Sequence, residues 1–140
     1  CMSRFTLDDY YGQRRTLTRV LSQERGKKID LEGKISRLRS ASTTLGNNLT
    51  AIEESSNTLG NLAINESQWR GAEKNKFDKN FQALQNHTKE FMNKTEDAKI
   101  EVEAELNRCE TSLASIEASI SRFEASLANV NAEIAARSDN

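Results

Sequence analysis

The stretch Asn65-Glu66-Ser67-Gln68-Trp69-Arg70-Gly71 separates two halves of the chain that carry the same apolar pattern. Within it the regular spacing of apolar residues lapses. Asn65 suits the end of one helix, and Ser67 suits the start of another. Gly71 permits the positive φ of a backbone turn, and Trp69 supplies a large apolar side chain where the helices part. The stretch therefore predicts a turn over residues 65–71, with Trp69 and Gly71 as its turn motif.

Upstream of this turn, apolar side chains recur at alternating spacings of four and three residues, which is a heptad repeat. The pattern predicts a helix over about 7–64. Its stripe runs through Tyr10, Leu17 and Leu21 and continues through the predicted helix–helix seam of Leu31, Ile35, Leu38, Leu45, Leu49, Ile52 and Leu59. Polar residues interrupt the same register at Arg14, Glu24, Lys28, Ser42 and Ser56. We therefore expect this seam to be only moderately stable.

Downstream of the turn, the heptad repeat resumes and predicts a second helix over about 72–136. Its predicted seam comprises Leu84, Phe91, Val102, Leu113, Ile116, Ile120, Phe123 and Leu127, and the stripe also includes Thr95, Cys109, Val130 and Ile134. We expect Cys109 to be a small buried apolar residue rather than a reactive thiol. Phe77 and Phe81 follow the turn within three turns of helix, so we expect them to pack at the hairpin tip.

Helices of similar length on both sides of a central turn predict an all-α fold. We expect an elongated, coiled-coil-like antiparallel hairpin of two helices, forming a single domain over residues 1–140. A break at Leu45-Gly46-Asn47-Asn48 is an alternative, because Gly and Asn are weak helix formers. Since Leu45 and Leu49 keep the register across that point, we expect a kink there at most.

The composition excludes several classes of function. The 20 basic and 21 acidic residues are interspersed along the chain and give a net charge of -1, which disfavours nucleic-acid binding. No apolar stretch is long enough to span a bilayer or to act as a signal peptide, so we expect a cytoplasmic protein without membrane insertion. One His and two Cys at no recognised spacing predict neither a metal site nor a cofactor.

The same pattern predicts that the protein is not an enzyme. Catalysis needs polar groups that converge in a shielded pocket, and two helices packed along one seam offer little such volume. The acidic residues fall mostly on faces away from the seam, where solvent-exposed ion pairs along a helix account for them. We therefore expect no catalytic residue.

A W-x-G turn near the middle of a Pro-free chain of two helices, followed closely by Phe77 and Phe81, resembles the W-x-G helical hairpin family of type VII secretion. The length of 140 residues and the absence of Y-x-x-x-D/E near the C-terminus make it most similar to the accessory proteins encoded with LXG toxins in Gram-positive bacteria. The resemblance implies a chaperone or targeting factor that binds the helical N-terminal domain of an LXG toxin. It also implies the type VII secretion ATPase as a partner, and secretion without a cleaved signal peptide. Because apolar residues such as Val20, Ile29 and Ile100 lie beside the seam, we also expect a second small helical accessory protein as a partner.

In some accessory proteins of this kind an F-x-x-x-D motif replaces the tyrosine signal, and Phe5-Thr6-Leu7-Asp8-Asp9 fits that pattern. The resemblance therefore makes Phe5 and Asp9 a candidate export signal. The spacing predicts that both lie on one face of a helix, one turn apart. Alternatively, Phe5 simply precedes a helix whose positive N-terminal end favours Asp8 and Asp9.

A structural coiled coil, either a spacer or a self-assembling rod, is the alternative function. Heptad repeats alone do not distinguish it from an adaptor. The turn distinguishes them, because a continuous rod does not require Trp69 and Gly71 at mid-chain. A continuous rod would also have a much larger hydrodynamic radius than a hairpin.

Overall fold

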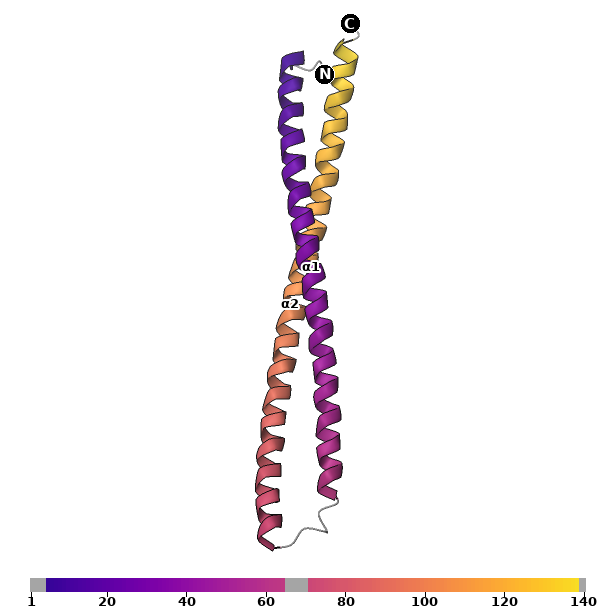
Figure 1. Ribbon diagram of the computed structural model, residues 1–140. Coiled ribbons are helices and arrows are strands. Elements are labelled where there is room, and N and C mark those ends of the chain that lie inside the picture. Colours follow the sequence, from indigo (N-terminus) through magenta and orange to yellow (C-terminus); the bar gives the residue numbers. More distant parts are fainter. Residues whose placement is uncertain (1–4, 65–70, 139–140) are drawn as a thin grey trace. The chain divides into compact units, whose positions relative to one another are not determined.

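The computed structural model describes residues 5–64 and 71–138, without the side chains of residues 62–64 and 72. Helix α1 spans Leu7–Ile64 and helix α2 spans Gly71–Ser138 (Figure 1). These bounds compare with 7–64 and 72–136 from the heptad pattern. The two long helices pack against each other and the described residues contain no strand, so the predicted all-α helical hairpin is confirmed.

The predicted turn lies largely outside the described residues, which include neither Trp69 nor the rest of 65–70. Gly71 is described and begins α2 with a φ of +52°. This is the left-handed region that side chains with a Cβ rarely adopt. Apart from the chain neighbours and the adjacent backbone of α2, no heavy atom of the described residues lies within 4 Å of the position where a Cβ would stand at Gly71. The requirement for glycine here is therefore one of backbone conformation and not of space.

The chain forms two compact units, each containing a segment of both helices. We call residues 1–36 and 107–140 the terminal unit, and residues 37–106 the central unit. The single domain over residues 1–140 stays a prediction. Helix α1 continues through residues 45–48, so the alternative of a loop at that point is wrong.

The core of the terminal unit lies on the predicted stripes. Its buried apolar side chains are Tyr10, Leu21, Ile35, Cys109, Ile120, Val130 and Ile134. Tyr10 of α1 packs with Val130 and Ile134 of α2, and Leu7, Tyr11 and Leu17 pack against this cluster. Cys109 is 4% exposed, which confirms the prediction of a buried apolar residue. Each helix therefore buries one face against the other, as the heptad repeat requires.

The central unit is less well covered. Thr95 is its one buried side chain among the described residues, and its Oγ1 donates a hydrogen bond of 2.8 Å to the carbonyl oxygen of Phe91. Leu84 and Phe91 lie on the predicted seam but are 45% and 59% exposed, so the prediction that they are buried there is wrong. Phe91 lines a shallow hollow together with Ala51, Ile52 and Ser55 of α1.

Polar residues on the stripe of α1 reach across to carboxylates of α2. In the terminal unit Lys28 Nζ lies 3.9 Å from Glu117 Oε1, an exposed pair that contributes little stability. In the central unit Ser42 Oγ donates to Glu103 Oε1 at 3.2 Å, and Lys99 Nζ lies 3.0 Å from the same oxygen. The hydrogen bond and charge of Lys99 lower the pKa of Glu103. Because this pKa is lowered in the folded state, the stabilisation is present at neutral pH and is lost as the pH falls through it.

Candidate functional site

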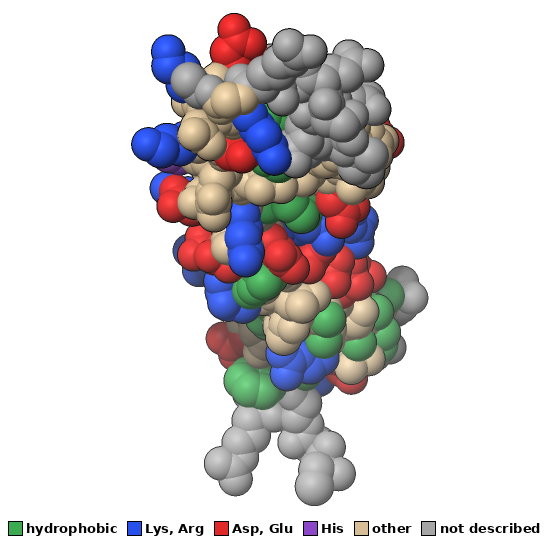
Figure 2. Space-filling model, turned by 90° about the horizontal axis from the view of Figure 1, so that it is seen from below, with side chains coloured by type: hydrophobic (Ala, Val, Ile, Leu, Met, Phe, Trp, Pro, Cys, Tyr) green, Lys and Arg blue, Asp and Glu red, His purple; other side chains and the backbone are tan. Residues whose placement is uncertain are grey.

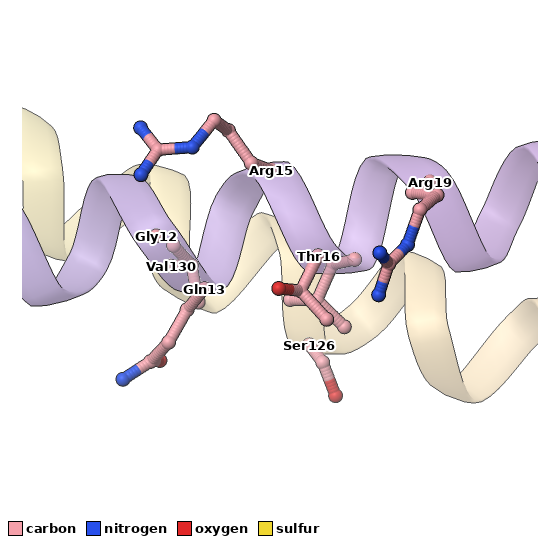
Figure 3. A pocket seen from close by; sticks show the side chains of 8 residues that line it. Gly12, Gln13, Arg15, Thr16, Arg19, Ser126 and Val130 are labelled. Carbon is pink, nitrogen blue, oxygen red and sulfur yellow. The ribbon is translucent and has the colours of Figure 1, made fainter.

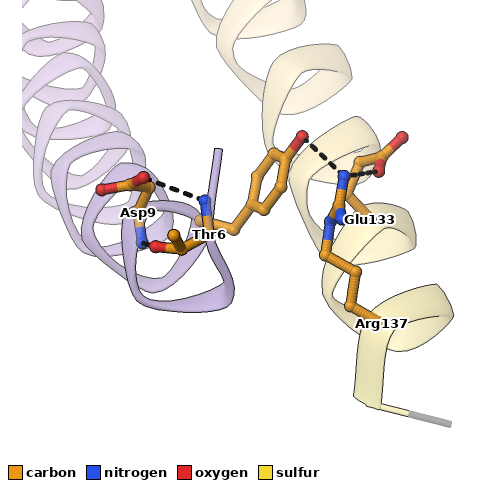
Figure 4. Close-up of polar contacts among 5 residues, drawn as sticks. Thr6, Asp9, Glu133 and Arg137 are labelled. Atoms are coloured by element: carbon orange, nitrogen blue, oxygen red, sulfur yellow. Dashed lines mark hydrogen bonds and ion pairs between the residues drawn. The ribbon is translucent and has the colours of Figure 1, made fainter. Parts of the chain in front are cut away.

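The first turn of α1 is closed by Thr6 and Asp9, one of the two candidate export residues. The Thr6 backbone N–H donates to Asp9 Oδ2 at 2.9 Å, and the Asp9 N–H donates to Thr6 Oγ1 at 3.2 Å (Figure 4). The Thr6 carbonyl accepts the first helical hydrogen bond, from the N–H of Tyr10 at 3.2 Å. Thr6 is therefore the N-cap residue, and the pair forms a capping box that satisfies two otherwise unpaired N–H groups.

Phe5, the other candidate export residue, precedes the N-cap. Its ring packs edge-on against the ring of Tyr10, with centroids 5.8 Å apart and an interplanar angle of 66°. A contact between the residue before the N-cap and the fourth helical residue is a hydrophobic staple, which sets the angle at which the chain enters the helix. Since Phe5 is not part of α1, the prediction that Phe5 and Asp9 lie one helical turn apart on one face is wrong.

Tyr10 connects this helix start to the end of α2. The Arg137 guanidinium lies over the Tyr10 ring, 4.9 Å from its centroid, and Arg137 Nη2 donates to the Tyr10 hydroxyl at 3.4 Å. The same nitrogen lies 3.4 Å from Glu133 Oε2 (Figure 4). Phe5 is 55% exposed and Asp9 is exposed, so both candidate residues are accessible beside this anchored pair. The N-terminal motif thus lies next to the C-terminal end of α2.

The aromatic residues predicted to pack at the tip contact each other. The rings of Phe77 and Phe81 are stacked, with centroids 5.6 Å apart and an interplanar angle of 16°. Together with Leu59 of α1 and Leu84 of α2 they line an apolar groove of the central unit. Whether Trp69 joins them lies outside the described residues.

Two features of the terminal unit were not predicted from the sequence. The capping box had a local signal, because Thr6 and Asp9 have the S/T-x-x-D/E spacing of a helix start. The second feature is a groove flanked by Arg15 and Arg19 of α1, with Val130 of α2 among its lining residues (Figure 3). The sequence feature that could have indicated this groove is the excess of basic residues over 10–29. The nearly neutral net charge of the whole chain does not reveal this local excess.

Other kinds of site find little support among the described residues. They contain no group of three His, Cys, Asp or Glu side chains that could hold a metal ion. Over the same residues, neither helix combines the length and apolarity needed to cross a membrane. On the face in Figure 2, basic and acidic side chains are interspersed with hydrophobic ones. This face is therefore neither uniformly charged nor uniformly apolar.

Comparison with known proteins places the chain in a family. No curated protein and no solved structure matches it. The family described as YwqH-like does match, over residues 12–132, which covers most of both helices. On this match the chain belongs to the YwqH-like family.

Proposed function

We propose that this protein is a non-enzymatic adaptor, which binds the helical N-terminal domain of an LXG-type toxin and targets the toxin for type VII secretion. The observation that carries this proposal is the family match over residues 12–132, because YwqH-like proteins are associated with LXG toxin systems. The partners in this proposal are the toxin's LXG domain, a second small helical accessory protein and the type VII secretion ATPase.

The exposed apolar side chains of the hairpin support a role in binding other helices. Ile29 in the terminal unit is 69% exposed, and in the central unit Phe91 and Ile100 are 59% and 58% exposed. Each helix of a hairpin buries only one face, and such helices gain most of their stability from further packing. Binding a helical domain would remove these side chains from water, at roughly 25 cal/mol for each Å² of apolar surface.

Co-expression with the toxin tests the binding step. We expect the full chain to co-purify with the LXG domain of its cognate toxin, and to form a complex of defined stoichiometry by size-exclusion chromatography with light scattering. The toxin's C-terminal domain, expressed alone, is the control and should not bind. A chain that remains unbound in the presence of the LXG domain, or that assembles into long rods by itself, would contradict the proposal.

Replacement of Phe5 or Asp9 tests the export step. Asp9→Asn keeps a side-chain oxygen that can accept from the Thr6 N–H, but removes the negative charge. Phe5→Leu keeps an apolar contact to Tyr10 but removes the aromatic ring. If both residues form the signal, each variant should lower the toxin secreted into the medium by at least about tenfold, as loss of a charged or aromatic anchor typically does. Binding of the LXG domain should stay unchanged.

Thr6→Ala is the matched control, because it removes the capping hydroxyl and leaves Phe5 and Asp9 in place. It should cost about 1 kcal/mol of helix stability and leave secretion intact. If Thr6→Ala reduced secretion as much as Asp9→Asn, then Asp9 would matter only for capping the start of α1, and the export assignment would be wrong.

A further inference from the structure

A groove in the terminal unit lies between the start of α1 and the end of α2 (Figure 3). Its apolar lining is Leu17 of α1 and Val130 of α2. Its other walls are formed by short side chains, including Thr16 of α1 and Ser126 of α2, and by Gly12. Short side chains allow the backbone of an approaching helix to come close, since helices pack 8–10 Å apart depending on the residues between them.

Arg15 and Arg19 flank this groove, and both also line an adjacent hollow on α1. Both side chains are exposed. Within the described part of the chain neither guanidinium has an ion-pair partner. Farther along α1 the situation differs, because Arg25 Nη2 lies 3.4 Å from Glu124 Oε1 of α2. The positive charge beside the groove is therefore not neutralised by an ion pair among residues 5–64 and 71–138.

The sequence around the groove is basic although the chain as a whole is not. Over residues 12–19, the part of α1 that lines the groove, Arg14, Arg15 and Arg19 are the charged residues and none is acidic. Over residues 126–130, the part of α2 that lines it, no residue is charged. Arginine pairs with carboxylates through two parallel N–H donors, and it is the basic residue favoured at protein interfaces. A nucleic acid would contact the arginines through its phosphates and would leave the apolar surface of Leu17 and Val130 without a contact. The combination of an apolar floor and a charged rim instead fits an amphipathic helix.

We propose that this groove binds an amphipathic helix of the LXG domain, which places small apolar side chains on Leu17 and Val130 and carboxylates against Arg15 and Arg19. The inference rests on the proposed function and adds to it the binding surface and the chemistry of the partner helix. The ion pairs between the partner's carboxylates and the two arginines orient the partner helix and make binding depend on the salt concentration.

Charge reversal tests the rim. The variant Arg15→Glu/Arg19→Glu should bind the purified LXG domain at least about tenfold more weakly by isothermal titration calorimetry at low salt, because like charges now face each other. Its matched control is Arg37→Glu/Lys79→Glu, which changes the net charge equally at exposed positions of the central unit that are distant in sequence from Ile29, Phe91 and Ile100. The control should bind with an affinity within about twofold of that of the unmodified chain, because charged residues outside an interface contribute little to binding. Circular dichroism should show equal helicity for both variants.

Filling the groove tests its shape. A Cβ at Gly12 would meet only the Arg15 Nη2 within 4 Å, at 3.8 Å, and a Cβ at Gly26 would meet nothing within that distance. Both Gly12→Leu and Gly26→Leu should therefore fold, and both should gain helix propensity by about 0.5–1 kcal/mol. Only Gly12→Leu places bulk in the groove, so it should weaken LXG binding by at least about tenfold, whereas Gly26→Leu should not.

The outcomes separate this inference from the proposed function. If the unmodified chain does not bind the LXG domain, both are wrong. If the unmodified chain binds and the two groove variants bind equally well, the adaptor function stands and the groove assignment is wrong. Weaker binding of both groove variants, with both controls unchanged, is the expected result.

Discussion

Leu21→Ala should lower the free energy of unfolding by about 3 kcal/mol, which is the usual cost of removing a fully buried leucine side chain. Leu21 is 1% exposed and is the largest fully buried side chain among the described residues. Its methyl groups lie in the seam of the terminal unit, where the loss leaves a cavity between two rigid helices. Because a hairpin has a small core, one such cavity is a large fraction of its stability.

Urea unfolding followed by circular dichroism measures this effect as a shift of the transition midpoint. Ile29→Ala is the matched control, because it removes a similar aliphatic side chain that is 69% exposed on the same helix. It should change the stability of the isolated chain by no more than about 0.5 kcal/mol. Equal effects of the two substitutions would mean that Leu21 does not lie in a buried seam.

Tyr10→Ala should lower the free energy of unfolding by about 3–4 kcal/mol. Tyr10 is 7% exposed and packs against Val130 and Ile134. The substitution removes this contact, the staple to Phe5 and the ring beneath the Arg137 guanidinium at once. The start of α1 should therefore separate from the end of α2. Hydrogen exchange would detect this separation as faster amide exchange in both segments.

Tyr10→Phe distinguishes the ring from its hydroxyl. It keeps the apolar packing and removes only the acceptor of the Arg137 hydrogen bond, which is long at 3.4 Å. We expect a loss of less than about 1 kcal/mol, measured by the same urea transitions. If Tyr10→Phe were as harmful as Tyr10→Ala, then the polar contact to Arg137 would hold the two helix ends together and the apolar cluster would not.

These contacts explain why the candidate export residues need careful controls. Phe5 and Asp9 fit an export motif, yet each also has a structural task, Phe5 in the staple and Asp9 in the capping box. A simple alanine substitution would remove both roles together. Asp9→Asn and Phe5→Leu are informative because they keep the local contact and change only the negative charge or the aromatic ring on which the proposed export signal depends.

The local sequence was sufficient for several features of the fold. The heptad repeats predicted two helices and their bounds, and every buried side chain found in the structure lies on one of the two predicted stripes. This succeeds because residues three and four positions apart share a helix face whatever lies opposite. The burial of Cys109 follows for the same reason. The capping box of Thr6 and Asp9 is equally local and could have been predicted from its spacing alone.

Only the tertiary structure decided how deeply each residue of a stripe is buried and which residues face each other. Leu84 and Phe91 have the same periodic position as buried residues, but they are exposed. The groove beside Arg15 exists because Ser126 and Val130 of α2 lie opposite this part of α1. Periodicity determines the direction in which a side chain points from its own helix. Burial and complementarity depend on the size and charge of the side chains on the neighbouring helix, and these become defined only when the antiparallel register brings the two segments together.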